Sequence, residues 1–287
     1  MRLPLILLFI LSSLGFGCQA QLNPQSKSIT KKFFPDPDIE INTPAFQKKK
    51  GFTEYDEMMA FINQHLQNHA DLMSLTYIGT SQKGMKIPMI TLRKKSEGEK
   101  LRVWLQGGLH GNEPGSTEAL LFLLDRLLND AEYSYLLNKL EITMVPMANI
   151  DGFEKQDRYA ANGLDLNRDQ TKLMAPESVF LKQAFSDYKA HVAVDFHEYR
   201  PYRRDFTKMS TFGVTGCYDV MFLYSGNLNV PENLRNYTKD VFVKNASAAL
   251  DSNQLSTHEY FSESKVIGAI EFHQGSLNSR SRATSYA

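Results

Sequence analysis

Apolar residues recur along the chain in two spacings, one typical of helices and one typical of strands. In the first helical segment, Met58, Met59, Ile62 and Leu66 share one face. Helices are predicted at residues 55–70, 119–128, 176–189 and 232–250. Strands are predicted at residues 74–79, 87–92, 101–106, 140–146, 191–197 and 266–272. Because strands alternate with helices, we expect an α/β domain with three layers, α/β/α, around a mixed, mostly parallel sheet.

Side chains that can bind a metal ion follow two of these strands. His110 and Glu113 come just after the strand at residues 101–106, and His197 ends the strand at residues 191–197. That last strand is short and almost wholly apolar in its middle, as expected for a strand buried on both faces. Ligands of open α/β sheets bind beyond the carboxyl ends of the strands. A His-x-x-Glu pair alone is more often a solvated part of a loop, so a metal site needs support from the rest of the chain.

The remaining histidines are interpreted as structural; they are His65, His69, His191, His258 and His273. His65 and His69 are four residues apart on the first predicted helix, which is amphipathic, so we expect both to face solvent. Asp195 shares a strand face with His197. We predict that Asp195 accepts a hydrogen bond from the imidazole of a metal ligand, because such ligands usually have a partner of this kind.

Composition and charge narrow the class of function. The chain has 287 residues, 42% of them apolar, and its 32 basic residues balance 32 acidic ones. One large core is therefore expected. Because basic residues are not in excess, the composition gives no support for nucleic acid as a partner.

The N-terminal residues have the pattern of a secretory signal. Arg2 precedes a continuous apolar stretch at residues 3–17, which is too short to span a membrane. We expect cleavage after Ala20; cleavage before Cys18 with lipidation of that cysteine is the alternative, and only then would the protein be anchored to a membrane. The sequence therefore predicts a signal peptide at residues 1–20, a proline-broken extension at 21–50 and the main domain at 51–287. The expected location is periplasmic or extracellular.

A second group of polar residues lies in a long loop after the strand at residues 140–146. It contains the sequence Asn149-Ile-Asp-Gly, then Arg158, then Asn162-Gly-Leu-Asp-Leu-Asn167-Arg168. A guanidinium is always charged and offers a planar set of donors, which suits a carboxylate or a developing oxyanion. Charge alone favours a simpler interpretation, in which the two arginines pair with aspartates on a solvated loop.

Taken together, these residues resemble the zinc carboxypeptidases of the M14 type. The resemblance rests on three motifs in the same order: His110-Gly-Asn-Glu113, the Asn-x-Asp-Gly and Asn-Gly-x-Asp-Leu-Asn-Arg loop, and His197 at the end of a strand. It covers about residues 53–272. Ile150 stands where the family often has proline, which is a mild departure.

The resemblance implies a role for six residues. His110, Glu113 and His197 match the ligands of one Zn²⁺ ion. Arg158 matches the arginine that stabilises the tetrahedral oxyanion. Asn167 and Arg168 match the pair that binds the terminal carboxylate of a peptide substrate. Two imidazoles and one carboxylate also suit zinc by ligand type.

The implied reaction is hydrolysis of the C-terminal amide bond of peptides by metal-activated water, with a glutamate as general base. In relatives this glutamate lies on a late strand. Glu271 is the late-strand candidate here, although its neighbours do not match the family's context for the base. We therefore expect the chain to stop, at Ala287, before the strand that supplies the base, so that the main domain is incomplete at its C-terminus.

Three functions compete on this reading. The first is an exported metallocarboxypeptidase that acts on peptides with a free C-terminal carboxylate. The second is a zinc amidohydrolase of small N-acyl amino acids, as in desuccinylase and aspartoacylase relatives. The third is a non-catalytic zinc-binding or peptide-binding fragment. The Asp151-Gly152 and Asn162-Gly163 pairs favour the first over the second, while the shared Asp-Leu-Asn-Arg sequence weakens that distinction.

Overall fold

The computed structural model describes Ser28, Lys32 and residues 39–95, 98–199, 218–226, 228–266 and 269–274. It forms two compact units, Met1–Glu40 and Ile41–Ala287. The predicted signal peptide, with Arg2 and Cys18, lies outside the described residues, so its boundaries stay predictions. Among the described residues, no helix is both long enough and apolar enough to cross a membrane.

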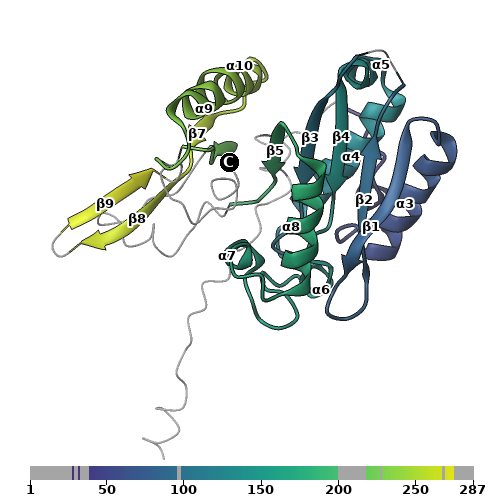
Figure 1. Ribbon diagram of the computed structural model, residues 1–287, viewed down its shortest axis with the longest axis horizontal. Coiled ribbons are helices and arrows are strands. Elements are labelled where there is room, and N and C mark those ends of the chain that lie inside the picture. The colour runs from purple at the N-terminus through teal and green to yellow at the C-terminus, as the bar shows by residue number, and fades with distance from the viewer. Residues whose placement is uncertain are drawn as a thin grey trace, which may run out of the picture. The chain divides into compact units, whose positions relative to one another are not determined.

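A mixed five-stranded sheet is the centre of the fold (Figure 1). Its strands are β1 (Met73–Thr80), β2 (Lys86–Leu92), β3 (Leu101–Gln106), β4 (Leu140–Val145) and β5 (Val192–Asp195), in the order β1-β2-β4-β3-β5. β1 and β2, and β2 and β4, are antiparallel, whereas β3 is parallel to β4 and β5. The expected α/β fold with a mixed sheet is confirmed. Within the described residues the sheet is not mostly parallel as expected, because β1 and β2 join it by antiparallel pairing.

Helices cover both faces of this sheet. On one face, α8 (Pro176–Tyr188) places Phe185 and Tyr188 against Trp104 of β3, with ring centroids 5.5 and 6.1 Å apart. Helices α3 (Tyr55–Asn68) and α4 (Gly115–Asn129) pack against each other, and α4 contacts β3. Their fully buried side chains include Met58, Ile62, Leu120, Leu121 and Leu124. The three expected layers are therefore present.

The prediction that His65 faces solvent is wrong. Helix α3 begins with a reciprocal cap between Glu54 and Glu57, and His65 lies on its buried face with 7% of its surface exposed. The imidazole packs edge-on against Phe61 and lies 3.5 Å from the carboxylate of Asp125 on α4. The polar face assumed from the sequence is thus covered by α4.

The strand that delivers His197 also differs from its prediction. β5 is shorter than expected and stands at the end of the strand order, where β3 is its one partner within the described part of the chain. Its residues are exposed or half-buried, and Val194 exposes 40% of its surface. The expectation of burial on both faces is therefore wrong for the described residues.

The remaining elements form smaller groups. β6 (Val220–Phe222) pairs in parallel with β7 (Thr257–Glu259), and between them run α9 (Glu232–Tyr237), a π-helical segment (Thr238–Val243) and α10 (Lys244–Ser252). β8 (Phe261–Val266) and β9 (Ala269–Gln274) form an antiparallel hairpin. The strand predicted at residues 266–272 corresponds to β9 from Ala269 onward, but its predicted start is wrong, because Val266 belongs to β8.

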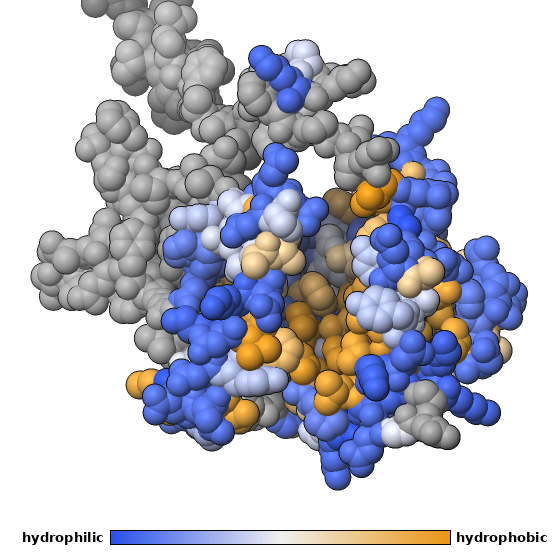
Figure 2. Space-filling model, turned by 90° about the horizontal axis from the view of Figure 1, so that it is seen from above, coloured by the Kyte–Doolittle hydropathy of each residue, from blue (hydrophilic) through white to orange (hydrophobic). Residues whose placement is uncertain are grey.

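Short elements complete the described chain. They are a 3₁₀ turn at Pro44–Gln47, α5 (Ala131–Ser134), a 3₁₀ turn at Tyr135–Asn138, α6 (Ile150–Phe153) and α7 (Leu166–Asp169). α6 and α7 fall in the stretch that was expected to be irregular. Figure 2 shows apolar residues gathered in the middle of one face, with hydrophilic residues around them.

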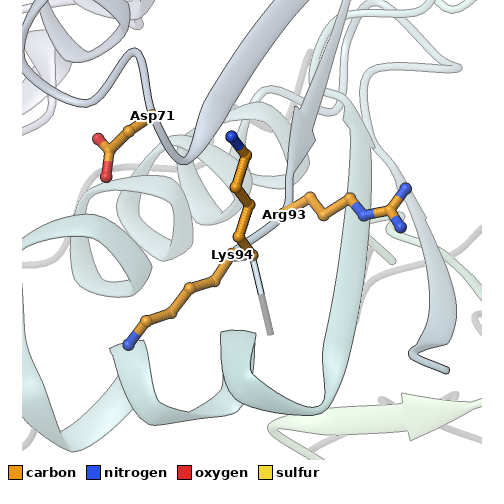
Figure 3. Close-up of a pocket in the computed structure, with 4 residues that line it drawn as sticks. Asp71, Arg93 and Lys94 are labelled. Carbon is orange, nitrogen blue, oxygen red and sulfur yellow. The ribbon is translucent and has the colours of Figure 1, made fainter. Parts of the chain in front are cut away.

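One charged pocket lies where β1 begins and β2 ends. It is lined by Asp71, Arg93, Lys94 and Lys95. β2 runs antiparallel to β4, and β4, β3 and β5 run in the same direction. The pocket therefore lies at the opposite end of the strands from the carboxyl ends of β3 and β5. The labelled side chains point in different directions and do not converge on one point (Figure 3).

Candidate metal centre

Parallel pairing of β3 and β5 brings the predicted ligands together. Gln106 and Asp195, the last residues of the two strands, are partners in the register. His110 and Glu113 lie in the turn between β3 and α4, and His197 follows β5 by two residues. The chain therefore leaves both strands at the same edge of the sheet, where the sequence placed the site.

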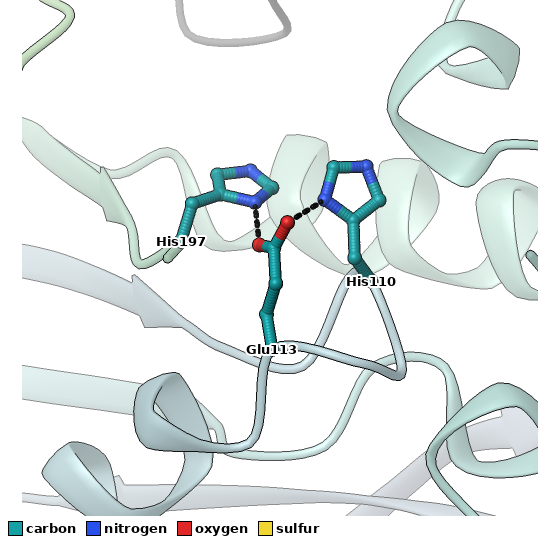
Figure 4. A group of neighbouring side chains, drawn as sticks. All are labelled: His110, Glu113 and His197. Carbon is teal, nitrogen blue, oxygen red and sulfur yellow. Dashed lines mark hydrogen bonds and ion pairs between the residues drawn. The ribbon is translucent and has the colours of Figure 1, made fainter. Parts of the chain in front are cut away.

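The carboxylate of Glu113 lies between the two imidazoles (Figure 4). Its Oε1 is 2.8 Å from Nδ1 of His110, and its Oε2 is 2.7 Å from Nδ1 of His197. One ligand atom from each residue lies within 4.8 Å of the others. His110 and Glu113 are buried, while 28% of the His197 side chain is exposed. The three groups thus converge on one point that solvent can reach.

A second carboxylate holds the outer nitrogen of each imidazole. Nε2 of His110 lies 3.2 Å from Oδ1 of Asp165, and Nε2 of His197 lies 2.8 Å from Oδ2 of Asp195. A carboxylate there favours a proton on Nε2, so that Nδ1 would bind a metal ion once it gives up its own proton and its hydrogen bond to Glu113. The predicted contact between Asp195 and His197 is confirmed. From the sequence, Asp165 was expected only to pair with an arginine. Its contact with His110 was not predicted, because the two residues are 55 positions apart.

These contacts shift the pKa values of the groups involved. Burial raises the pKa of Glu113, but hydrogen bonds from His110 and His197 outweigh it and lower the pKa to about 2. Burial lowers the pKa of His197, but Asp195 and Glu113 outweigh it and raise the pKa to about 9. Burial likewise raises the pKa of Asp165, and the contacts with His110 and Arg158 bring it below its usual range. Both carboxylates are therefore ionised at neutral pH.

The donor set fits zinc. Two imidazole nitrogens and one carboxylate are the ligands that catalytic zinc sites use. Each Nδ1 already faces the shared carboxylate, and each Nε2 already has an acceptor. The residues that would orient the ligands are thus in place alongside them.

Arg158 lies beside this group. Its Nε and Nη2 donate to Oδ2 of Asp165 at 3.0 and 2.9 Å, and its Nη1 lies 3.6 Å from Oε1 of Glu113. About a third of its side chain is exposed. The guanidinium is therefore fixed by Asp165 beside the carboxylate of Glu113. Its pairing with an aspartate, expected on charge alone, occurs inside the site rather than on a solvated loop.

Asn167 and Arg168 lie on α7, which begins directly after Asp165. Asp165 caps this turn by accepting from the backbone N–H of Asn167 at 2.9 Å. The amide oxygen of Asn167 is buried and has no hydrogen-bond partner within the described residues. Arg168 is exposed and donates to the carbonyl of Asn167 at 3.2 Å. Asp165 thus links the predicted carboxylate-binding pair to His110 and Arg158.

The Asn149-x-Asp-Gly motif is structural. Asn149 accepts from the N–H of Gly152, and Asp151 is buried and accepts from Ser81 and from the backbone of Lys83. A Cβ on Gly111 would overlap the backbone of Gly152. Two chain segments therefore approach closely here, and the glycine at position 111 allows the turn that carries His110 to rest on the long loop.

Glu271, the candidate base, lies on β9 opposite Ser264 of β8. This hairpin is a separate sheet from the one that carries the metal ligands. Its side chain lies outside the described features, so its role stays a prediction.

Comparisons with known proteins agree with this geometry. The family model for zinc carboxypeptidases, peptidase M14, matches residues 58–279. Carboxypeptidase 2 of Trichophyton equinum is 32% identical over 275 residues, which are 88% of this chain and 50% of that protein. Carboxypeptidase 2 of Trichophyton rubrum is 29% identical over 272 residues, 87% of this chain and 49% of that protein. The chain thus spans about half the length of the curated relatives it matches.

Solved structures show the same fold. Carboxypeptidase A from Helicoverpa armigera superposes with a TM-score of 0.60 at 17% identity, covering 76% of this chain and 61% of that one. A metallo-carboxypeptidase from Burkholderia cenocepacia gives 0.59 at 19% identity, covering 72% and 53%. On the strength of the family match and its agreement with the motifs, the chain belongs to the zinc carboxypeptidase family, peptidase M14.

Proposed function

We propose that this protein is an exported, zinc-dependent carboxypeptidase that hydrolyses the C-terminal amide bond of peptides. The observation that carries the proposal is the convergence of His110, Glu113 and His197 on one point, with a carboxylate behind each imidazole. The family match supports the same activity. The N-terminal pattern of residues 1–20 supports export.

The metal would be held by the two Nδ1 atoms and the Glu113 carboxylate. Bound there, zinc supplies Lewis-acid polarisation of the scissile carbonyl and makes water a stronger nucleophile. Arg158, held by Asp165, places a fixed positive charge beside that carbonyl, where negative charge develops during hydrolysis. Such a charge lowers the barrier because it needs no reorganisation during the reaction.

The substrate's terminal carboxylate is assigned to Asn167 and Arg168. Arg168 is exposed, and α7 joins it to Asp165 and so to the metal centre. A planar guanidinium binds a carboxylate through two parallel hydrogen bonds. This pair selects peptides with a free C-terminus, which distinguishes an exopeptidase from an endopeptidase.

The test is hydrolysis by the full-length gene product of two substrates, a hippuryl-type dipeptide and an N-acyl aspartate. The proposal expects release of the terminal amino acid from the first and little from the second, with loss of activity in a chelator. Preferential cleavage of the N-acyl aspartate would instead support the amidohydrolase alternative. Zinc binding without hydrolysis of either would support a non-catalytic role.

Two variants make this test sharper. Arg168→Ala should raise KM for the peptide far more than it lowers kcat, because it removes binding of a group remote from the reacting bond. Glu271→Gln decides whether Glu271 is the general base. Retained hydrolysis in the Glu271→Gln variant would exclude it, whereas loss with unchanged zinc binding would support it.

A further inference from the structure

Glu198, the residue after His197, makes two contacts with the segment that carries Glu113. Its backbone N–H donates to Oε2 of Glu113 at 3.2 Å, the same oxygen that His197 contacts at 2.7 Å. Its carboxylate accepts from the backbone N–H of Gly115, the first residue of α4. One residue thus joins the end of β5 to both the ligand Glu113 and the helix that follows it.

The fit at Gly115 is close. A Cβ at that position would lie 2.7 Å from Oε1 of Glu198, nearer than side chains normally approach. The first N–H groups of a helix have no partner within the helix, and the helix dipole favours a negative charge there. Pro114, the N-cap residue, provides no side-chain cap. The carboxylate of Glu198 therefore supplies a missing acceptor to α4 from a distant part of the chain.

We propose that Glu198 is a positioning residue for the metal centre. By fixing the chain after His197 to the start of α4, it sets the distance between the imidazole of His197 and the carboxylate of Glu113. The carboxylate is occupied by Gly115, so Glu198 acts through the ligands rather than as one of them. This inference rests on the proposed function, because it requires zinc to bind at the three ligands.

The experiment measures the zinc dissociation constant of the full-length protein by competition with a chromogenic chelator. Glu198→Ala should weaken zinc binding by about tenfold, the size expected for residues that orient metal ligands. Glu198→Gln keeps an oxygen acceptor for Gly115 and should stay within about threefold of the wild type. Glu154→Ala, which removes an exposed glutamate from the long loop, is the matched control and should bind zinc as the wild type does.

Gly115→Ala provides an independent test. Alanine favours a helix more than glycine does, so helix stability alone predicts a more stable protein. The positioning role predicts weaker zinc binding, by about as much as in Glu198→Ala, because the added Cβ displaces the carboxylate. The double variant Glu198→Ala/Gly115→Ala should bind zinc no more weakly than Glu198→Ala alone, since the carboxylate that the added Cβ would displace is already absent.

Each outcome decides a separate point. A wild-type protein that binds no zinc contradicts the proposed function itself. If the wild type binds zinc and Glu198→Ala binds it within about twofold, the positioning role alone is overturned. Losses in Glu198→Ala and Gly115→Ala that multiply in the double variant would also overturn it, because the two substitutions would then act through different contacts.

Discussion

Two histidines in this chain have the same arrangement of carboxylate partners, although they come from different parts of the sequence. His110 and His197 each turn Nδ1 toward Glu113 and Nε2 toward an aspartate. Ligands that are already oriented lose less conformational freedom when a metal ion binds. Asp165 and Asp195, which contact the Nε2 atoms, are therefore expected to contribute to zinc affinity without contacting the metal.

Asp195→Asn tests this contribution. The amide has the same size as the carboxylate but lacks its charge, so it no longer fixes the proton on Nε2 of His197. We expect zinc binding to weaken about 10- to 100-fold, measured by competition with a chelator. Asp187→Asn, at an exposed position on α8, is the control. Equal zinc affinity in Asp195→Asn and the control would contradict the role of Asp195.

The lowered pKa of His65 predicts that the stability of the fold depends on pH. Burial lowers its pKa below the ordinary value of 6.5, an effect that Asp125 opposes and His69 reinforces. The unfolded chain therefore binds a proton more readily, so the stability that neutral His65 provides is fully present above pH 6.5 and is lost as the pH falls from there through the lower pKa of His65 in the folded protein.

The measurement is urea unfolding of the wild type and His65→Gln at two pH values, one above and one below 6.5. The wild type should lose more unfolding free energy on acidification than His65→Gln does. His69→Gln, one helical turn away, should keep most of the wild-type loss, because it leaves His65 buried and removes only the smaller contribution of His69 to the pKa shift. An equal loss in the wild type and His65→Gln would show that His65 does not titrate in this way.

At the level of the element, the sequence predicted most helices and strands of the sheet but not their surroundings. Strand β3 was predicted with its observed bounds, because its apolar run ends at a glycine pair. The burial of His65 depends on α4, and the exposure of β5 depends on which strands pair with it. Periodicity within a segment does not contain such information. The β8–β9 hairpin was missed because residues 266–272 alone look like one strand.

The hydrogen bond between Thr53 and Glu118 is expected to contribute to the stability of the fold. Thr53, which is fully buried, donates its hydroxyl to Oε2 of Glu118 in α4 at 2.8 Å and accepts from the N–H of Ala45 at 3.1 Å. Burial raises the pKa of Glu118, which the hydrogen bonds of Thr53 oppose. The segment before α3 is thereby tied to the helix that follows the metal ligands.

Thr53→Val removes the hydroxyl and keeps the shape of the side chain. We expect the free energy of unfolding to fall by about 1–3 kcal/mol, because the half-buried carboxylate of Glu118 keeps one partner fewer. Thr76→Val, at an exposed position in β1, is the control. Denaturant unfolding of both variants measures the difference, and a cost no larger in Thr53→Val than in Thr76→Val would contradict this account.

At the level of the whole molecule, the three ligands could be predicted because motifs are local in sequence and the edge of a parallel sheet brings them together. The structure supports that assignment by placing Glu113 between both imidazoles (Figure 4). The contact of Asp165 with His110 and the link from Glu198 to Gly115 could not be predicted. They join residues 55 and 83 positions apart, and only the packing of loops around the site determines them.

The central claim is that His110, Glu113 and His197 bind one zinc ion. Elemental analysis of the purified, dialysed protein and of its three single alanine variants tests it most directly. The account predicts one zinc per chain in the wild type and a large loss in each variant, with folding checked by circular dichroism. A wild type without stoichiometric zinc, or variants that keep it, would contradict the claim.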